Sequence, residues 1–299
     1  MKIAIYSRAQ AIHNVSDLEN LFEILKKHCI KTYYNDDFAE LIDKLTNVYI
    51  APEYRYSSHE QLDNKIDIVI SYGGDGTFLE CVRMVYGCDT PIVGINSGRL
   101  GFLATVNKNE IETLLCDIKN KKYTLEQRTM LRIESDDIKN LEYPFAFNEF
   151  TVQREGAEMV KADVSVDGEF VATYWGDGVI LSTPSGSTAY ALSVGGPIIP
   201  PQNNCMALLP IASHNLTMRP IIFPDSSTVS FEVDSRDSHQ YISLDNRKFN
   251  LPGKATIKVT KAKKSIFLLK PQNISFYNTL RKKMMWGFDG REVADDKNC

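Results

Sequence analysis

The sequence lacks the signatures of several protein classes. Its six cysteines form no C-x-x-C pair, and they stand apart at Cys29, Cys81, Cys88, Cys116, Cys205 and Cys299. This scatter excludes a disulfide framework and a zinc site of paired thiolates, and it predicts reduced thiols of a cytoplasmic protein. No apolar run is long enough to span a bilayer, and residues 1–7 are too short and too alternating for a signal peptide. We therefore expect no membrane partner.

Positively and negatively charged residues are nearly balanced. Lys and Arg number 34 against 38 Asp and Glu, which gives a formal net charge of -4. This balance lacks the basic excess of proteins that bind nucleic acid or anionic membranes, so nucleic acid is not an expected partner. A chain of 299 residues with 43% hydrophobic and 24% charged residues is long and apolar enough for two domains, each with its own core.

The first part of the chain alternates short apolar runs with helical patterns. Strands are predicted over 2–6, 66–71 and 91–95, and helices over 77–85 and 107–119. A capping box, Ser16-Asp17-Leu18-Glu19, is predicted to open a further helix. This alternation favours a parallel, doubly wound sheet, which binds ligands at the carboxyl ends of its strands. Two glycine-rich segments, 73–76 and 94–101, fall at such ends.

From about residue 122 the period changes to strict alternation of apolar and polar residues. Residues 162–166 alternate and run into a hairpin turn at Asp167-Gly168. The pattern predicts an antiparallel β region with one helix just after Pro184-Ser185-Gly186. The charge-rich run 258–264 is predicted to be a solvated edge strand, and residues 293–299 a frayed tail.

The first stretch that indicates chemistry is Gly73-Gly74-Asp75-Gly76-Thr77. Glycine turns between a strand and a helix bind phosphate, because free N–H groups and the helix dipole favour anions. The stretch matches neither G-x-x-x-x-G-K-[ST] nor G-x-G-x-x-G, and its carboxylate would repel a phosphate. Two hypotheses explain Asp75. It caps the helix, or it accepts the proton of an alcohol beside a bound phosphate and helps to place Mg²⁺.

The second stretch is Asn148-Glu149, between two aromatic residues at the start of the β region. Such a pair can simply terminate a strand. If it faces a cleft, Asn148 donates and accepts hydrogen bonds while Glu149 accepts from two hydroxyls. That pairing suits a ribose diol or an adenine edge.

The third stretch, residues 176–197, is rich in glycine and hydroxyl side chains. A serine hydrolase is not favoured, because Thr183 stands where the first glycine of a G-x-S-x-G elbow belongs. A polar loop that caps a helix is the plainer alternative, but it does not account for so many small and hydroxyl residues beside Tyr190. Such an arrangement lets a planar base approach the backbone and stack on the ring.

Together these stretches resemble the NAD kinase family over roughly residues 65–280. The S-T-P-S-G-S-T-A-Y run is specific, whereas related lipid kinases carry turns similar to G-G-D-G-T. The matching segments, in the family's order, are Gly73-Gly74-Asp75-Gly76-Thr77, Gly98-Arg99-Leu100-Gly101-Phe102-Leu103, Asn148-Glu149, Asp177-Gly178, Ser182-Thr183-Pro184-Ser185-Gly186-Ser187-Thr188-Ala189-Tyr190, His214 and Arg219-Pro220.

The resemblance implies transfer of the γ-phosphoryl group of ATP to the 2′-hydroxyl of the adenosine ribose of NAD, with a divalent metal, Mg²⁺. Asp75 would be the general base. Asn148 and Glu149 would bind the ribose and adenine region, Ser185 and residues 188–193 the adenine, and Asp177 the nicotinamide end. The implied substrate-binding residues are Asp75, Gly76, Phe102, Asn148, Glu149, Asp177, Ser185, Thr188, Ala189, Tyr190, Ala191, Leu192, Ser193 and Arg247.

The resemblance also implies a fold class and an assembly. The fold is an N-terminal doubly wound α/β domain plus a larger, mainly antiparallel β-sandwich-like domain. We expect the α/β domain over 1–120, completed by about 271–299, and the β domain over 121–270. Family members form homodimers or homotetramers and bind small-molecule nucleotides. Trp175 stands where many relatives have a basic residue and position 247 varies, so the choices of NAD or NADH and of ATP or polyphosphate stay open.

Two alternatives remain beside the NAD kinase interpretation. A lipid kinase of the diacylglycerol type would need an apolar entrance or a basic membrane-facing surface, and the sequence shows no amphipathic basic helix. A non-catalytic NAD-binding module would be expected to have lost Asp75, which is intact.

Overall fold

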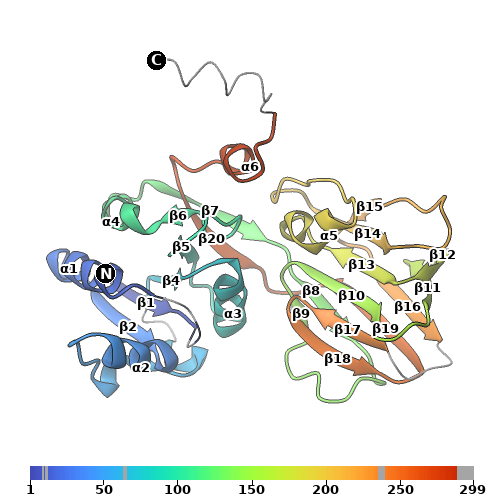
Figure 1. The fold of residues 1–299 in the computed structure, drawn as a ribbon, viewed down its shortest axis with the longest axis horizontal. Coiled ribbons are helices and arrows are strands. Elements are labelled where there is room, and N and C mark those ends of the chain that lie inside the picture. The colour runs from blue at the N-terminus through green and yellow to red at the C-terminus, as the bar shows by residue number, and fades with distance from the viewer. Residues whose placement is uncertain (9, 11–12, 63–65, 235–239, 288–299) are drawn as a thin grey trace. The chain divides into compact units, whose positions relative to one another are not determined.

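The computed structural model describes residues 1–8, 10, 13–62, 66–234 and 240–287. It forms two compact units (Figure 1). Unit 1 comprises Met1–Glu126 and Phe267–Cys299, and unit 2 comprises Gln127–Ile266. The expected domain ranges 1–120 with 271–299, and 121–270, stay a prediction. The tail expected over 293–299 lies outside the described residues.

Unit 1 is built on an eight-stranded sheet with the order β3-β2-β1-β4-β5-β20-β7, in which β6 also pairs with β5. Its strands are β1 (Lys2–Tyr6), β2 (Lys31–Asn35), β3 (Arg55–Tyr56), β4 (Ile68–Tyr72), β5 (Ile92–Asn96), β6 (Val106–Asn107), β7 (Tyr123–Arg128) and β20 (Ile266–Pro271). The pairs β1–β2, β1–β4, β4–β5 and β5–β20 are parallel. The predicted parallel sheet is confirmed, and β1, β4 and β5 match the three predicted strands within one or two residues.

Helices cover both faces of this sheet. The helices of unit 1 are α1 (Val15–Lys27), α2 (Asp36–Leu45), α3 (Asp75–Val85), α4 (Ile111–Lys119) and α6 (Phe276–Met284), of which α1 to α4 pack on the sheet, and short 3₁₀ turns lie at Pro52–Tyr54, His59–Leu62 and Lys108–Glu110. Apolar residues of α1, α2 and α4 share one core cluster with Val93 and Ile95 of β5. Successive strand residues point to opposite faces. A Cβ at Gly94 would lie 3.0 Å from the Phe78 ring, so α3 packs on the other face.

The helix starts reveal one error in the sequence prediction. The cap of α1 is Asn14, whose Oδ1 accepts the Ser16 N–H at 3.2 Å, and not the capping box predicted at Ser16. Asparagine caps as well as serine does, and the apolar positions of α1 fit a start two residues earlier. Before α4, Asn107 and Glu110 form a capping box, which agrees with the helix predicted from residue 107.

Unit 2 consists of two antiparallel six-stranded sheets. One has the order β15-β14-β13-β10-β17-β18 and the other β12-β11-β16-β19-β8-β9. The strands are β8 (Leu131–Glu134), β9 (Phe145–Ala146), β10 (Glu149–Arg154), β11 (Val160–Val166), β12 (Glu169–Gly176), β13 (Gly178–Ser182), β14 (Cys205–Ile211), β15 (Ile221–Pro224), β16 (Val229–Asp234), β17 (Gln240–Leu244), β18 (Arg247–Leu251) and β19 (Lys254–Lys261).

The two sheets of unit 2 pack face to face around one apolar core, as the expected β-sandwich-like domain requires. The Phe150 and Phe231 rings, one from each sheet, lie 5.1 Å apart. The predicted edge strand at 258–264 is wrong, because β19 pairs with β16 on one side and with β8 on the other. Its lysines alternate with buried residues and point away from the core, so charge marks an outer face here and not an edge.

The predicted helix after Pro184 is short. A 3₁₀ turn over Ser185–Thr188 leads into a single turn of α-helix, α5 (Tyr190–Ser193). Among the helices of the described ranges, none combines the length and apolar character needed to cross a membrane.

Candidate active site

The glycine turn joins β4 directly to α3. Position 73 requires glycine because the Thr77 side chain lies close to its backbone, and a Cβ there would come within 2.5 Å of Oγ1 of Thr77. Gly74 is the N-cap residue, and Asp75 is the first helical residue, whose carboxylate accepts N–H groups of residues 102–104 and not those of its own helix. The helix-cap hypothesis for Asp75 is therefore wrong. Helix geometry leaves the N–H groups of this first turn without intrahelical partners, which favours an anion.

A cavity of about 350 Å³ opens on this turn. Its lining residues are Arg8, Gln10, Gly73, Gly74, Gly76, Thr77 and Ser97. The Arg8 guanidinium donates to the Gly76 carbonyl at 2.6 Å and pairs with Glu80 at 2.7 Å. A fixed positive charge beside helix N–H groups makes this cavity suitable for a phosphate chain.

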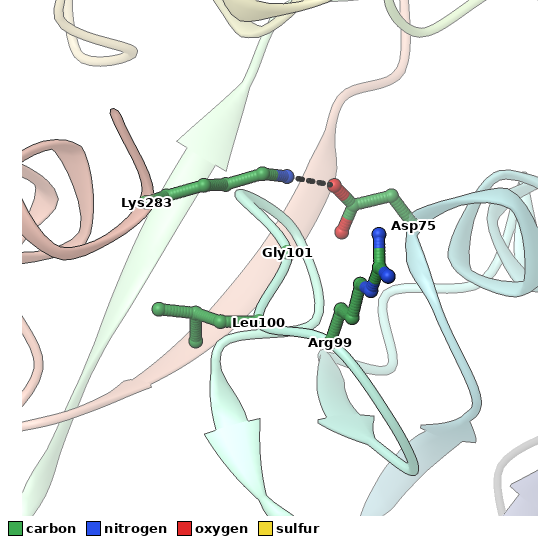
Figure 2. Close-up of a pocket in the computed structure, with 5 residues that line it drawn as sticks. All are labelled: Asp75, Arg99, Leu100, Gly101 and Lys283. Carbon is green, nitrogen blue, oxygen red and sulfur yellow. Dashed lines mark hydrogen bonds and ion pairs between the residues drawn. The ribbon is translucent and has the colours of Figure 1, made fainter. Parts of the chain in front are cut away.

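The Asp75 carboxylate points away from that cavity, toward the loop that follows β5. Its Oδ1 accepts the N–H groups of Leu103 at 3.0 Å and Ala104 at 2.9 Å. Its Oδ2 accepts the Phe102 N–H at 2.9 Å and lies 3.4 Å from Nζ of Lys283 (Figure 2). Three hydrogen bonds from backbone N–H groups and one ion pair thus fix the carboxylate.

A second cavity, of about 490 Å³, lies on this side of Asp75. Figure 2 shows its lining residues, Asp75, Arg99, Leu100, Gly101 and Lys283. The two cavities share no lining residue. The turn thereby presents backbone amides to one cavity and a carboxylate to the other, which explains how a negative side chain is compatible with a phosphate-binding turn.

In unit 2, the Asn148-Glu149 pair is held by a residue that sequence reasoning missed. Asp245, in the turn between β17 and β18, accepts the N–H groups of Phe147 at 2.9 Å, Asn148 at 2.7 Å and Glu149 at 3.3 Å. Burial raises the pKa of Asp245, whereas the hydrogen bonds from these three backbone N–H groups act to lower it. The only local signal for Asp245 was a hairpin turn, which gives no partner.

Each side chain of the Asn148-Glu149 pair has one buried oxygen that receives no hydrogen bond from the described residues. Within the described residues, Oδ1 of Asn148 and Oε2 of Glu149 are inaccessible to solvent and have no hydrogen-bond partner. Burial, and then the charge of Asp245, raise the pKa of Glu149 to about 8. Unsatisfied buried acceptors are costly, and in native proteins they indicate a ligand that supplies the missing donors.

The hydroxyl-rich run, residues 176–197, is hydrogen-bonded to the backbone at this pair. The Thr183 N–H donates to the Asn148 carbonyl at 2.8 Å, and Oγ1 of Thr183 donates to the Phe147 carbonyl at 2.7 Å. A Cβ at Gly186 would lie 2.2 Å from the Asn148 carbonyl oxygen, so only glycine fits there. The structure therefore brings two stretches of sequence into one site.

Tyr190 lies at the same place. Its N–H bonds to the Glu149 carboxylate, and its hydroxyl donates to Oε1 of Gln153 at 3.3 Å. The ring is partly buried and packs against an apolar cluster that includes Ile180 and Leu209. The ring and Glu149 thus form a fixed pair, with an aromatic face beside buried acceptors.

The other predicted residues of the run have identifiable neighbours. Ser185 is buried and accepts from Nη1 of Arg128 at 3.3 Å, and Thr188 donates to the Ser185 carbonyl at 3.4 Å. Ala189 precedes α5, and Leu192 and Ser193 lie on it. The Ala191 side chain packs in the apolar cluster, so only its backbone is available to a ligand.

Two predicted substrate residues lie in separate surroundings. Asp177 pairs with Nε of Arg154 at 2.7 Å, with both side chains about a third exposed. The Arg247 guanidinium donates to the carbonyls of Tyr143 and Phe145, so it supports the strand that leads to Asn148. The half-exposed Trp175 lies with its ring 5.3 Å from that of His214.

Comparison with known proteins identifies the family of the chain. Residues 3–123 match the ATP-NAD kinase N-terminal domain, and residues 147–270 match the ATP-NAD kinase C-terminal domain. An NAD kinase of Flavobacterium psychrophilum is 38% identical over 97% of this chain and 100% of its own length. An NAD kinase of Christiangramia forsetii is also 38% identical, with the same coverage of both chains.

Solved structures show the same fold. Yeast NADH kinase complexed with NADH superposes with a TM-score of 0.84 at 23% identity, over 97% of this chain and 89% of that chain. An NAD kinase from Archaeoglobus fulgidus in complex with ATP gives 0.73 at 23% identity, over 95% and 99%. With both domains matched and with relatives aligned over nearly its whole length, the chain belongs to the NAD kinase family.

Proposed function

We propose that this enzyme transfers the γ-phosphoryl group of ATP to the 2′-hydroxyl of the adenosine ribose of NAD, giving NADP. Family membership supports both substrates and the phosphotransferase class. The observation that carries the proposal is the glycine turn. It offers amides and Arg8 to a phosphate chain on one side and the Asp75 carboxylate on the other. Phosphoryl transfer to an alcohol needs both functions next to each other.

In the proposed reaction, the ribose oxygen forms a bond to the γ-phosphorus. The bond from this phosphorus to the bridging oxygen breaks, and ADP leaves. The hydroxyl proton passes to Asp75, which acts as general base. Gly76 follows Asp75 in the chain, and the Phe102 N–H donates to its carboxylate, so we assign both residues to the same end of the substrate.

Unit 2 supplies recognition of the dinucleotide in this proposal. Asn148 and Glu149 take hydroxyl and amino donors of the ribose and adenine region, since their buried acceptors have no other partner among the described residues. Tyr190 places its ring against the adenine. The remaining assignments to the substrate, supported by the family pattern, are Asp177, Ser185, Thr188, Ala189, Ala191, Leu192, Ser193 and Arg247.

A divalent ion fits this site as part of the nucleotide. The described residues contain no group of three or more side chains suited to hold a metal, and the oxygens of Asp75 already accept four donors. Mg²⁺ is commonly bound by substrate phosphates with few protein ligands. When bound, it neutralises charge on the phosphate chain. Asp75 is the residue that we place nearest to it.

Incubation with γ-labelled ATP, Mg²⁺ and either NAD or diacylglycerol tests the proposal. We expect label in a dinucleotide that an NADP-specific dehydrogenase accepts, and none in lipid. Label in lipid alone would favour the lipid kinase alternative, for which the relatives and domains found here give no support. A 3′-phosphorylated product would keep the kinase but reject the proposed alignment of the ribose. Replacing ATP by polyphosphate shows which phosphoryl donor the enzyme prefers. Replacing NAD by NADH shows which form of the dinucleotide it prefers.

Two further assignments belong to the proposal. We assign a homodimer or homotetramer, supported by the family and by the outer strand β15, which exposes Ile221 and Ile222. Light scattering of the purified protein measures this directly. We assign a cytoplasmic location, supported by the thiols at Cys29, Cys81, Cys116 and Cys205, none of which forms a disulfide in the described part of the chain.

A further inference from the structure

Lys283 reaches Asp75 from the far end of the chain. It lies on α6, whose start is fixed by the Ser275 side chain, which accepts the Asn278 N–H. Thr279 and Leu280 of α6 are buried, and a residue three or four positions later shares their face of the helix. Lys283 occupies that position, whereas Lys282 lies about 100° around the helix from it. The Lys283 side chain is one-third exposed.

The Asp75 carboxylate has no acceptor position left. A carboxylate offers about four lone-pair sites, two on each oxygen. Oδ1 receives the amides of Leu103 and Ala104, and Oδ2 receives the amide of Phe102 and the ammonium of Lys283. A general base must accept a hydrogen bond from the hydroxyl that it deprotonates. One of the four donors must therefore give way when the acceptor alcohol binds.

The four donors differ in how readily they can leave. The three amides belong to one loop, in which Gly101 N–H also donates to the Ala104 carbonyl at 3.2 Å, so they move only together. The Lys283 contact is the longest, 3.4 Å against 2.9 to 3.0 Å, and it is made by a flexible side chain. Its ammonium already lies 4.6 Å from the centre of the Phe102 ring, which can retain it through a cation–π contact.

We propose that Lys283 is a positioning residue that holds the fourth acceptor position of Asp75 in the free enzyme. The 2′-hydroxyl of the substrate takes this position and displaces the ammonium toward the Phe102 ring. The inference rests on the proposed function, because it needs an acceptor hydroxyl at Asp75. Partly exposed ion pairs contribute little, so the displacement lowers substrate affinity only modestly. In return, the free carboxylate stays fixed in one orientation.

Four binding constants test this role without any turnover. NAD, and NAD that lacks the adenosine 2′-hydroxyl, are titrated calorimetrically into the wild-type protein and into K283M, with no ATP present. Methionine keeps length and flexibility but removes the charge. We expect the preference for NAD over its 2′-deoxy form to rise by about two- to fivefold in K283M, the range that an exposed ion pair contributes. K282M removes a charge from the same helix turn and should leave this preference unchanged.

The outcomes separate the two proposals. An equal preference in the wild type and in K283M overturns the role of Lys283, and so does a preference that falls, because the ammonium would then help to bind the hydroxyl. Failure of the wild type to make NADP from NAD and ATP would instead overturn the proposed function. A merely structural role of Lys283 would lower the melting temperature and raise the KM for NAD, whereas displacement predicts a lower KM.

Discussion

Gly101 lies directly against Asp75, so that a Cβ at position 101 would come within 1.9 Å of Oδ1 of the carboxylate. The carboxylate is held by three amides of the same loop, and it cannot retreat without losing them. We therefore predict that Gly101→Ala displaces Asp75. Misplacement of a reacting group by about 1 Å reduces turnover by about two orders of magnitude. Steady-state rates of NADP formation measure this loss.

The same loop offers a matched control. A Cβ at Gly98 would meet no atom within 4 Å. Gly98→Ala should therefore keep near-normal turnover and melt close to the wild type. Equal activity of the two variants would contradict the close approach.

Asp75→Asn removes the proposed general base and keeps the size of the side chain. The rate should fall by about two orders of magnitude or more, because general base catalysis contributes at least this much. NAD affinity should change far less. Asp89→Asn, at an exposed site beyond the other end of α3, serves as the control. Near-normal turnover of Asp75→Asn would remove this residue from the mechanism.

Glu149 makes the stability of the protein fall with rising pH. Its pKa rises from 4.5 to about 8 on folding, because of burial and the nearby Asp245. Between these values the folded state holds a proton that the unfolded state has released, so the free energy of unfolding declines as pH rises from 4.5 to 8. The decline from this group is on the order of a few kcal/mol. Denaturant titrations at pH 5 and pH 8 measure it.

Glu149→Gln should remove most of this decline, since a neutral amide mimics the protonated carboxyl at every pH. Glu158→Gln, at an exposed position in the same unit, should retain it. The same decline in all three proteins would assign the pH dependence to other groups, of which Asp245 is the first to test by Asp245→Asn.

Tyr190→Ala should mainly raise the KM for NAD. Loss of a stacked ring weakens binding by about 1 kcal/mol or somewhat more. Tyr190→Phe loses only the hydrogen bond to Gln153 and should remain close to the wild type. A raised KM for ATP with an unchanged KM for NAD would show that the pocket binds the other nucleotide.

Local sequence determined much of this protein. The apolar runs and their periods gave β1, β4, β5 and the body of α3, because burial of one face is a local pattern. Glycine spacing and the hydroxyl-rich run were enough to identify the family, and with it Asp75 and the Asn148-Glu149 pair. These features are local in the chain, and each is visible without knowledge of its neighbours in space.

Tertiary structure decided which groups meet. Asp75 is held by amides of residues 102–104 and by Lys283, which is 208 positions away, and Asp245 anchors the backbone at Asn148. No period or motif encodes such pairs, since long-range partners depend on how strands are ordered in a sheet. For the same reason the sequence could not show that β19 lies inside its sheet, between β16 and β8, although its charged residues indicated an edge strand. Sequence therefore pointed to the groups that we propose to react, and the fold determined which acceptor positions on them are occupied.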